Sequence, residues 1–376
     1  MEQLLSTLGA TATSSVIRDL LRLVDRPGIV SLAGGLPAAE SFPVERIRQA
    51  TAVALDALGT YGNPALQYGP TEGDSGLRAV VAGRYGAAVE QVLVTSGSQQ
   101  ALDLVARALV DAGDVVVVES PTYLGTLQAL RTRSPHLVPI ACDRDGLDVE
   151  ALAARLAAGL RPKLVSVVPN FQNPTGSVLS LERRRRLVHL AAHYGFVIVE
   201  DDPYSPLRFR GEPLPSLWQL GGASDRVISL GTSSKLLAPG LRVGWAVAPS
   251  WLMAPMVRLK QSTDLHTAGL GQMIVADLLG DAVFMAAHHH RLADVYGRRC
   301  RALADALDGH AVFDTPDGGM FLWAAVPGCD TAAALDRAVA GGVAYVPGAA
   351  FGVEGGFADR LRLSFATAPI GAFPTA

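Results

Sequence analysis

The sequence predicts an α/β protein with a large domain, built on a mostly parallel sheet between helices, and a smaller α+β domain. Short, mostly aliphatic runs with apolar residues on both faces alternate with helix-like segments through the middle of the chain, as expected for strands covered on both sides. Shorter strand-like runs follow a long helical segment in the last third. With 376 residues, of which 49% are hydrophobic, the chain can form more than one core.

The strands of the large sheet are predicted at 91–95, 115–118, 163–168, 197–200, 227–230 and 243–247. Helices predicted at 99–109 and 181–193 separate some of them, which favours parallel crossover connections. The smaller domain is predicted to contain a helix over 284–307 and strands at 319–323, 343–346 and 360–364. We expect an N-terminal arm over 1–45, with a helix at 14–24, that joins the small domain and borders the substrate entrance. The large domain would span 46–270 and the small domain 271–376.

Composition excludes several classes of function. A net charge of −3 and a pI near 6.2 provide no basic surface for nucleic acid or an anionic membrane. Cys142, Cys300 and Cys329 are far apart, which argues against a disulfide framework, and the consecutive histidines at 288–290 cannot converge on one metal ion. The N-terminus lacks a signal-peptide pattern, and no apolar stretch is long enough to span a bilayer. We expect a cytoplasmic protein that binds small molecules and copies of itself. We expect no metal site.

Lysine chemistry has few candidates, because the chain contains three lysines and twenty-nine arginines. An ammonium group becomes a nucleophile only where burial or neighbouring cations disfavour its charge. Lys163 and Lys260 lie in polar segments, and we expect both to be solvated. Lys235 follows a predicted strand and lies between hydroxyl residues and a Pro-Gly turn, so it is the best candidate.

Five polar segments lie at the ends of predicted strands or in loops, where open α/β sheets bind their ligands. They are residues 95–101, 169–176, 200–204, 232–242 and 361–364. Each has a simpler explanation: Asn-Pro-Thr-Gly is a good turn, and Ser-Gly-Ser or an aspartate pair often begins a helix. Their order and spacing together indicate a common function.

The combination resembles the fold-type I, class I/II aminotransferases that use pyridoxal 5′-phosphate, over nearly the whole chain. The likeness is closest to the branch of 2-aminoadipate and kynurenine aminotransferases, and segments 26–37, 66–73, 97–103, 171–176 and 264–267 carry it. It implies a large domain with a mostly parallel, seven-stranded-type sheet and a homodimer with shared active sites. Such an enzyme transfers the amino group of an L-amino acid to a 2-oxo acid, here 2-oxoglutarate.

The resemblance also implies the residues that hold the cofactor ring. Lys235 would bind the cofactor covalently and then act as a general base. Asp201 would keep the pyridine nitrogen protonated, so that the ring accepts electrons, with Asp202 as an outer carboxylate. Three further side chains would contact the ring: Tyr123 by stacking, unless it is an ordinary core aromatic, and Asn173 and Tyr204 through the ring oxygen.

The phosphate would bind at the start of the helix that opens with Ser98 and Gln99, because free N–H groups and the helix dipole favour an anion there. The remaining phosphate contacts implied by the resemblance are Thr232, Ser234, Arg242 and, from the second subunit, Tyr68.

The substrate α-carboxylate would pair with Arg362, for which Arg360 on the same strand face is the competitor. Gly35 and Asn173 would also contact the substrate. Arg18, on the predicted N-terminal helix, would pair with the distal carboxylate of an acidic donor, but the same arginine fits a solvated helix face. Candidate donors are therefore 2-aminoadipate and aromatic, branched-chain or aryl-glycine amino acids.

Two other functions are alternatives, and the first of them would use the same residues. One is β-elimination of a sulfur leaving group, and the other is a non-catalytic ligand-sensing domain of the kind fused to DNA-binding modules. We rank the sensing domain last, because no basic helix-turn-helix segment precedes residue 31. Family members usually continue into a closing helix after the arginine strand, whereas this sequence stops at Ala376, so we expect different packing in the small domain.

Overall fold

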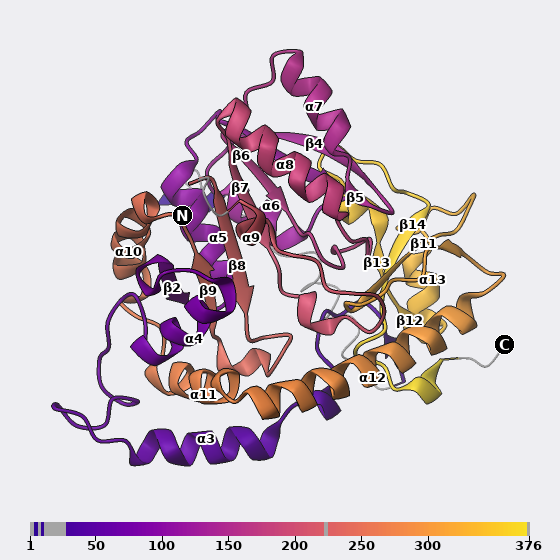
Figure 1. The fold of residues 1–376 in the computed structure, drawn as a ribbon. Coiled ribbons are helices and arrows are strands. Elements are labelled where there is room, and N and C mark those ends of the chain that lie inside the picture. The colour runs from indigo at the N-terminus through magenta and orange to yellow at the C-terminus, as the bar shows by residue number, and fades with distance from the viewer. Residues whose placement is uncertain (1–3, 7–8, 11–27, 222–224, 374–376) are drawn as a thin grey trace.

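The computed structural model describes residues 4–6, 9–10, 28–221 and 225–373, and Figure 1 shows its ribbon. The helix predicted over 14–24 lies outside the described residues.

The large sheet has the strand order β2-β9-β8-β7-β6-β3-β4-β5. These strands are β2 (Val92–Thr95), β9 (Gly244–Val247), β8 (Val227–Thr232), β7 (Val197–Asp201), β6 (Leu164–Val167), β3 (Val115–Ser120), β4 (His136–Asp143) and β5 (Gly146–Leu147). Strand β9 is antiparallel to both neighbours and β5 is antiparallel to β4, whereas the other pairs are parallel. The predicted mostly parallel sheet is thus confirmed. Strand β4 was not predicted, because its exposed and partly buried positions interrupt the apolar run that marks the other strands.

Helices cover both faces of this sheet. On strand β3, Val116 and Val118 pack with the helices of one face, and Val117 packs with those of the other. One face carries α5 (Ser98–Leu109), α6 (Leu124–Arg131) and α10 (Ser250–Asp264), and the other carries α7 (Val149–Ala157), α8 (Leu181–Tyr194) and α9 (Leu217–Leu220). Burial on both faces is the reason that the central strands are mostly aliphatic.

Three helices pack together beside β2: α3 (Val44–Asp56), α4 (Ser75–Tyr85) and α11 (Gly269–Gly280). The predicted domain boundary at residue 270 falls inside α11, which packs on α3 and α4. None of the described helices is long and apolar enough to cross a bilayer by itself. Only α11 and α12 (Ala282–Leu307) meet that test, as a pair bent by 88°.

The C-terminal part contains a separate antiparallel sheet with the order β10-β11-β14-β13, of which β11, β14 and β13 are labelled in Figure 1. Its strands are β10 (Val312–Phe313), β11 (Phe321–Ala325), β14 (Arg360–Ser364) and β13 (Val346–Pro347), with helix α13 (Leu335–Ala340) between β11 and β13 in the chain. Strand β1 (Val30–Ser31) pairs with β12 (Val343–Ala344), so the N-terminal segment contacts this part of the chain.

The prediction of one strand over 343–346 was wrong. The chain changes partners at Tyr345, whose buried hydroxyl donates to Thr331 O, so β12 and β13 belong to different sheets. An apolar run does not reveal its partner strand.

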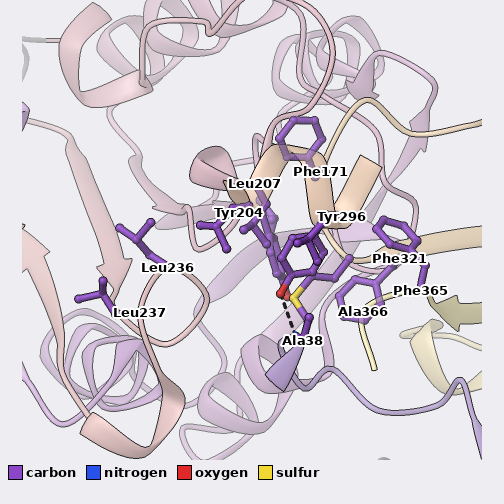
Figure 2. Packing of buried hydrophobic residues seen from close by; sticks show 14 of the residues in the cluster. Ala38, Phe171, Tyr204, Leu207, Leu236, Leu237, Tyr296, Phe321, Phe365 and Ala366 are labelled. Atoms are coloured by element: carbon purple, nitrogen blue, oxygen red, sulfur yellow. Dashed lines mark hydrogen bonds between the residues drawn. The ribbon is translucent and has the colours of Figure 1, made fainter. Parts of the chain in front are cut away.

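A large hydrophobic cluster connects the two sheets (Figure 2). Tyr204, Leu236 and Leu237 contribute from loops of the large sheet, and Phe321 and Tyr296 contribute from β11 and α12. The Tyr296 hydroxyl also accepts a hydrogen bond from the backbone N–H of Ala38 at 3.1 Å. The loops that carry Tyr204, Leu236 and Leu237 therefore pack against residues of the C-terminal sheet and of α12 as well as against the large sheet.

Candidate active site

A cavity of about 350 Å³ lies where the loops after β2, β3, β6, β7 and β8 converge. Arg242 joins them because β9 is antiparallel to its neighbours, which brings the residues before β9 to the same edge. Arg362 reaches the cavity from β14. Predicted site residues that line this cavity are Gly35, Ser98, Gln99, Tyr123, Asn173, Asp201, Tyr204, Thr232, Ser234, Lys235, Arg242 and Arg362.

Two predicted site residues are not in this group. Tyr68 is 79% exposed, lies outside the cavity of its own chain and packs edge-on against His266 at 5.6 Å between ring centroids. Arg18 lies outside the described residues. Roles for both stay predictions.

Lys235 follows β8 and projects into the cavity, where its Nζ donates to Gly35 O at 2.8 Å. Burial, reinforced by the positive charges of Arg362 and Arg242, lowers the pKa of Lys235 to about 8. A share of this amine is therefore neutral near physiological pH, as a nucleophile requires.

The other two lysines differ from each other. The side chain of Lys163 is 45% exposed and pairs with Asp114 at 2.7 Å, in line with the expected solvated charge. The same expectation for Lys260 was wrong, because its side chain is 0% exposed. Its ammonium is paired with Asp264 at 2.6 Å, one helical turn later, which allows the charge to be buried.

Asp201 ends β7 and is 2% exposed. Burial, reinforced by the neighbouring Asp202, raises the pKa of Asp201 to about 7. Its Oδ1 has no hydrogen-bond partner among the described residues, which is a costly arrangement for a buried carboxylate. A ligand that carries a ring N–H fits this unpaired oxygen, so the site accommodates a protonated pyridine.

Asp202 directly follows β7, and its side chain has different surroundings. It accepts hydrogen bonds from Asn170 Nδ2 at 2.9 Å and from the backbone N–H of Ser205 at 3.0 Å, and it does not line the cavity. These contacts agree with the expected outer position.

Polar and aromatic side chains lie close to Asp201. Asn173 Nδ2 lies 3.5 Å from the Tyr204 hydroxyl, and both residues are buried. Burial raises the pKa of Tyr204, and burial together with the charge of Asp201 raises the pKa of Tyr123 to about 12, so both phenols stay protonated and can donate. Tyr204 is held edge-on by Phe321, with 5.9 Å between the ring centroids.

At the other end of the cavity, α5 begins after Gly97, whose φ of 92° favours glycine. A Cβ on Gly97 would lie 2.5 Å from Arg242 Nη2, so the glycine also allows the guanidinium to approach. Arg242 donates to Ser96 O at 2.9 Å, and Thr232 Oγ1 lies 3.0 Å from Ser234 Oγ. Free N–H groups, hydroxyls and a guanidinium form a suitable cradle for a phosphate.

Arg362 is 1% exposed, and its guanidinium lies 4.2 Å from the centre of the Phe321 ring. It donates to Asn173 Oδ1 at 2.9 Å and to Ala33 O at 2.6 Å, while its Nε has no partner among the described residues. Burial lowers the pKa of Arg362 to about 10, which leaves it charged at neutral pH. Arg360 is more exposed and lies outside the cavity.

Sequence reasoning missed part of the cavity wall, including Leu36, Leu124, Gln128 and Phe321. Leu124 and Gln128 lie one turn apart at the start of α6, directly after Tyr123. The signals that could have identified them are the position of Leu124 directly after Tyr123 and the i, i+4 spacing of Leu124 and Gln128.

Comparison with known proteins agrees with this geometry. Residues 27–370 match the family profile described as aminotransferase class I and II. The chain is 43% identical to a 2-aminoadipate transaminase of Thermus thermophilus, with 94% of this chain and 89% of the relative covered. It is 42% identical to aromatic-amino-acid aminotransferase 1 of Thermococcus litoralis, with 95% and 88% covered.

A solved structure shares the fold over nearly the full length. The alpha-aminoadipate aminotransferase from Thermus thermophilus, complexed with N-(5′-phosphopyridoxyl)-L-leucine, has a TM-score of 0.91 and 40% identity, and the match covers 98% of this chain and 94% of that chain. The predicted fold-type I architecture is confirmed by this match. The chain therefore belongs to the class I and II aminotransferases, and its cofactor is pyridoxal 5′-phosphate.

Proposed function

We propose that this enzyme transfers the amino group of a 2-aminoadipate, aromatic, branched-chain or aryl-glycine type L-amino acid to 2-oxoglutarate, in a homodimer. The observation that carries the proposal is the convergence of Lys235, Asp201 and Arg362 on one cavity from three separate elements. They provide an amine with a lowered pKa, an unpaired carboxylate and a buried guanidinium.

The bound cofactor supplies an electron-accepting ring that stabilises negative charge at the substrate α-carbon. Lys235 Nζ would hold the cofactor and, when free, would be the base that takes the proton from the substrate α-carbon and later gives it back. A pKa of about 8 suits a base that both accepts and releases a proton near neutral pH.

Several side chains of the cavity would hold the cofactor ring. Asp201 Oδ1, which has no partner among the described residues, would accept a ring N–H and keep that proton in place. Asn173 and Tyr204, whose Nδ2 and hydroxyl lie 3.5 Å apart, would donate to the ring oxygen, and Tyr123 would stack on the ring.

The two ends of the cavity hold anions. The start of α5, with Ser98 and Gln99, binds the phosphate, and the accompanying side chains are Thr232, Ser234 and Arg242. Arg362 binds the substrate α-carboxylate as a planar fork beside Asn173 and Gly35.

A second subunit completes the phosphate site through Tyr68. Large apolar residues are exposed along the segment that leads to Tyr68: Leu55, Leu58, Tyr61 and Leu66. Leu58 is 96% exposed, and such a concentration of apolar side chains favours burial against a second copy of the chain.

The cavity wall suggests which donors fit. Arg242 and Arg362 are the arginines that line it among the described residues, and both are assigned to other anions. Leu36, Leu124 and Phe321 favour apolar side chains. An acidic donor needs a further cation, for which we propose Arg18. Replacement of Arg18 by alanine should then lower the rate with 2-aminoadipate but not with phenylalanine.

The central test is chemical. Borohydride treatment of the cofactor-loaded protein, followed by peptide mass spectrometry, should place the adduct on Lys235. The adduct should be absent in Lys235→Ala and retained in Lys163→Ala. Single-turnover assays with a donor panel, with and without 2-oxoglutarate, then identify the reaction. An adduct elsewhere would contradict the assignment, and acceptor-independent release of pyruvate and ammonia would indicate elimination.

A further inference from the structure

Lys260 and Asp264 form an ion pair at the end of α10 that the mechanism above does not use. Neither residue lines the cavity, and the Lys260 side chain is 0% exposed. Burial lowers the pKa of Lys260, in opposition to its hydrogen bond with Asp264. A buried ion pair is often no more stabilising than a well-packed apolar pair, so stability alone does not account for it.

The second carboxylate oxygen of this pair leads to the start of α5. Asp264 Oδ2 accepts hydrogen bonds from Ser96 Oγ and from Gln100 Nε2, both at 2.8 Å. Gln100 Oε1 in turn accepts the backbone N–H of Ser96 at 2.7 Å. One carboxylate therefore ties together both sides of the turn that contains Gly97.

The charge of Asp264 is stable in this position. Burial by itself would raise the pKa of Asp264, but the hydrogen bonds from Lys260, Gln100 and Ser96 together lower it. With one oxygen held by Lys260 and the other by Ser96 and Gln100, the carboxylate has little freedom to rotate.

The same network reaches the guanidinium at the phosphate end. Ser96 O accepts a hydrogen bond from Arg242 Nη2 at 2.9 Å, and Arg242 crosses directly over Gly97. Lys260 is thus bonded to Asp264, Asp264 to the Ser96 hydroxyl, and the backbone carbonyl of the same serine to Arg242.

We propose that Lys260 and Asp264 are positioning residues for the cofactor phosphate: they hold the turn over 96–100 and Arg242 in the geometry that binds the dianion, without contacting it. The inference rests on the phosphate site proposed above. The physical reason is that hydrogen-bond donors bind a charged group more tightly when the protein holds them in the binding geometry before the ligand arrives.

The test compares two ligands that differ only at the phosphate. The apo forms of wild type, Lys260→Met and Ser96→Ala are titrated with pyridoxal 5′-phosphate and with pyridoxal, and affinity is read from quenching of protein fluorescence without turnover. Lys163→Met, which breaks the exposed pair with Asp114, is the matched control. We expect both network variants to lose on the order of 10-fold in affinity for the phosphorylated ligand, the effect of a displaced charge-assisted hydrogen bond. The loss for pyridoxal should stay below roughly 2-fold, as should both losses in the control.

An equal loss for both ligands, or no loss for the phosphorylated one, would overturn the inference. Ser96→Ala leaves the ion pair intact, so it decides the matter if Lys260→Met does not fold. Should the wild type bind both ligands equally, the phosphate site itself would be refuted, and the inference with it.

Discussion

Replacement of Asp201 by asparagine should have opposite effects on the apoprotein and on cofactor binding. The carboxylate is buried, and its Oδ1 has no partner among the described residues until a ring N–H arrives. The charge therefore destabilises the apoprotein, whereas it pairs with the bound ring. The asparagine side chain has the same shape but no charge, so Asp201→Asn should stabilise the apoprotein at alkaline pH and weaken cofactor binding.

The magnitude follows from the pKa of Asp201, which burial and the adjacent Asp202 raise from 3.8 to about 7. Between these values the native state binds more protons than the unfolded state, so stability falls as the pH rises from 3.8 and levels off above about 7. The rise of the Asp201 pKa from 3.8 to about 7 corresponds to about 4 kcal/mol of destabilisation of the native state above pH 7. At pH 5.5 only about 2 kcal/mol of that destabilisation is present. The stability difference between Asp201→Asn and wild type should therefore change by about 2 kcal/mol from pH 5.5 to pH 8 in favour of the variant.

Urea unfolding of the apoproteins at both pH values measures this change. Any fixed effect of the new amide cancels, because it is present at both pH values. Asp114→Asn is the control: the hydrogen bond from Lys163 lowers the pKa of Asp114, so its contribution is constant between pH 5.5 and 8. A pH-independent difference for Asp201→Asn would refute the assigned charge state, and unchanged cofactor affinity would refute the ring contact.

Two further substitutions test the substrate fork and the support of the site. Arg362→Lys keeps the charge but loses the planar fork of donors. The KM for the amino donor should therefore rise on the order of 10-fold or more, while cofactor affinity is unchanged. A changed kcat with an unchanged KM would contradict this role of Arg362. Arg184 is fully buried and donates to four acceptors, including Pro169 O and Asn170 Oδ1 beside the cavity loop. Arg184→Ala should lower the free energy of unfolding by about 3 kcal/mol, against about 0.5 kcal/mol or less for the exposed Arg185→Ala, as measured by urea denaturation.

Much of the fold and site was accessible from sequence because its signals are local. Strands β3, β6, β7 and β8 are mostly aliphatic and buried, since helices cover both faces of the sheet. Once these strands are parallel, their carboxyl ends must meet at one edge. The order of the polar segments along the chain therefore predicted that Asn173, Asp201 and Lys235 converge.

Other features depended on contacts between segments that are distant in the chain. The partly exposed β4 lacks the apolar run, and the division of 343–346 depends on which strand each half pairs with. Arg360 and Arg362 share one strand face, but Phe321 and Phe351 pack around Arg362, which also donates to Asn173 and Ala33, whereas the Arg360 side chain is 40% exposed.

The sequence by itself determined the fold class, the family likeness and the set of reactive side chains, because periodicity and turn chemistry are encoded by neighbouring residues. Only the tertiary structure decided that Lys260 is buried and that Asp264 links it to the start of α5. The burial of a charge depends on partners brought together through space, and the spacing of residues along the chain does not specify them.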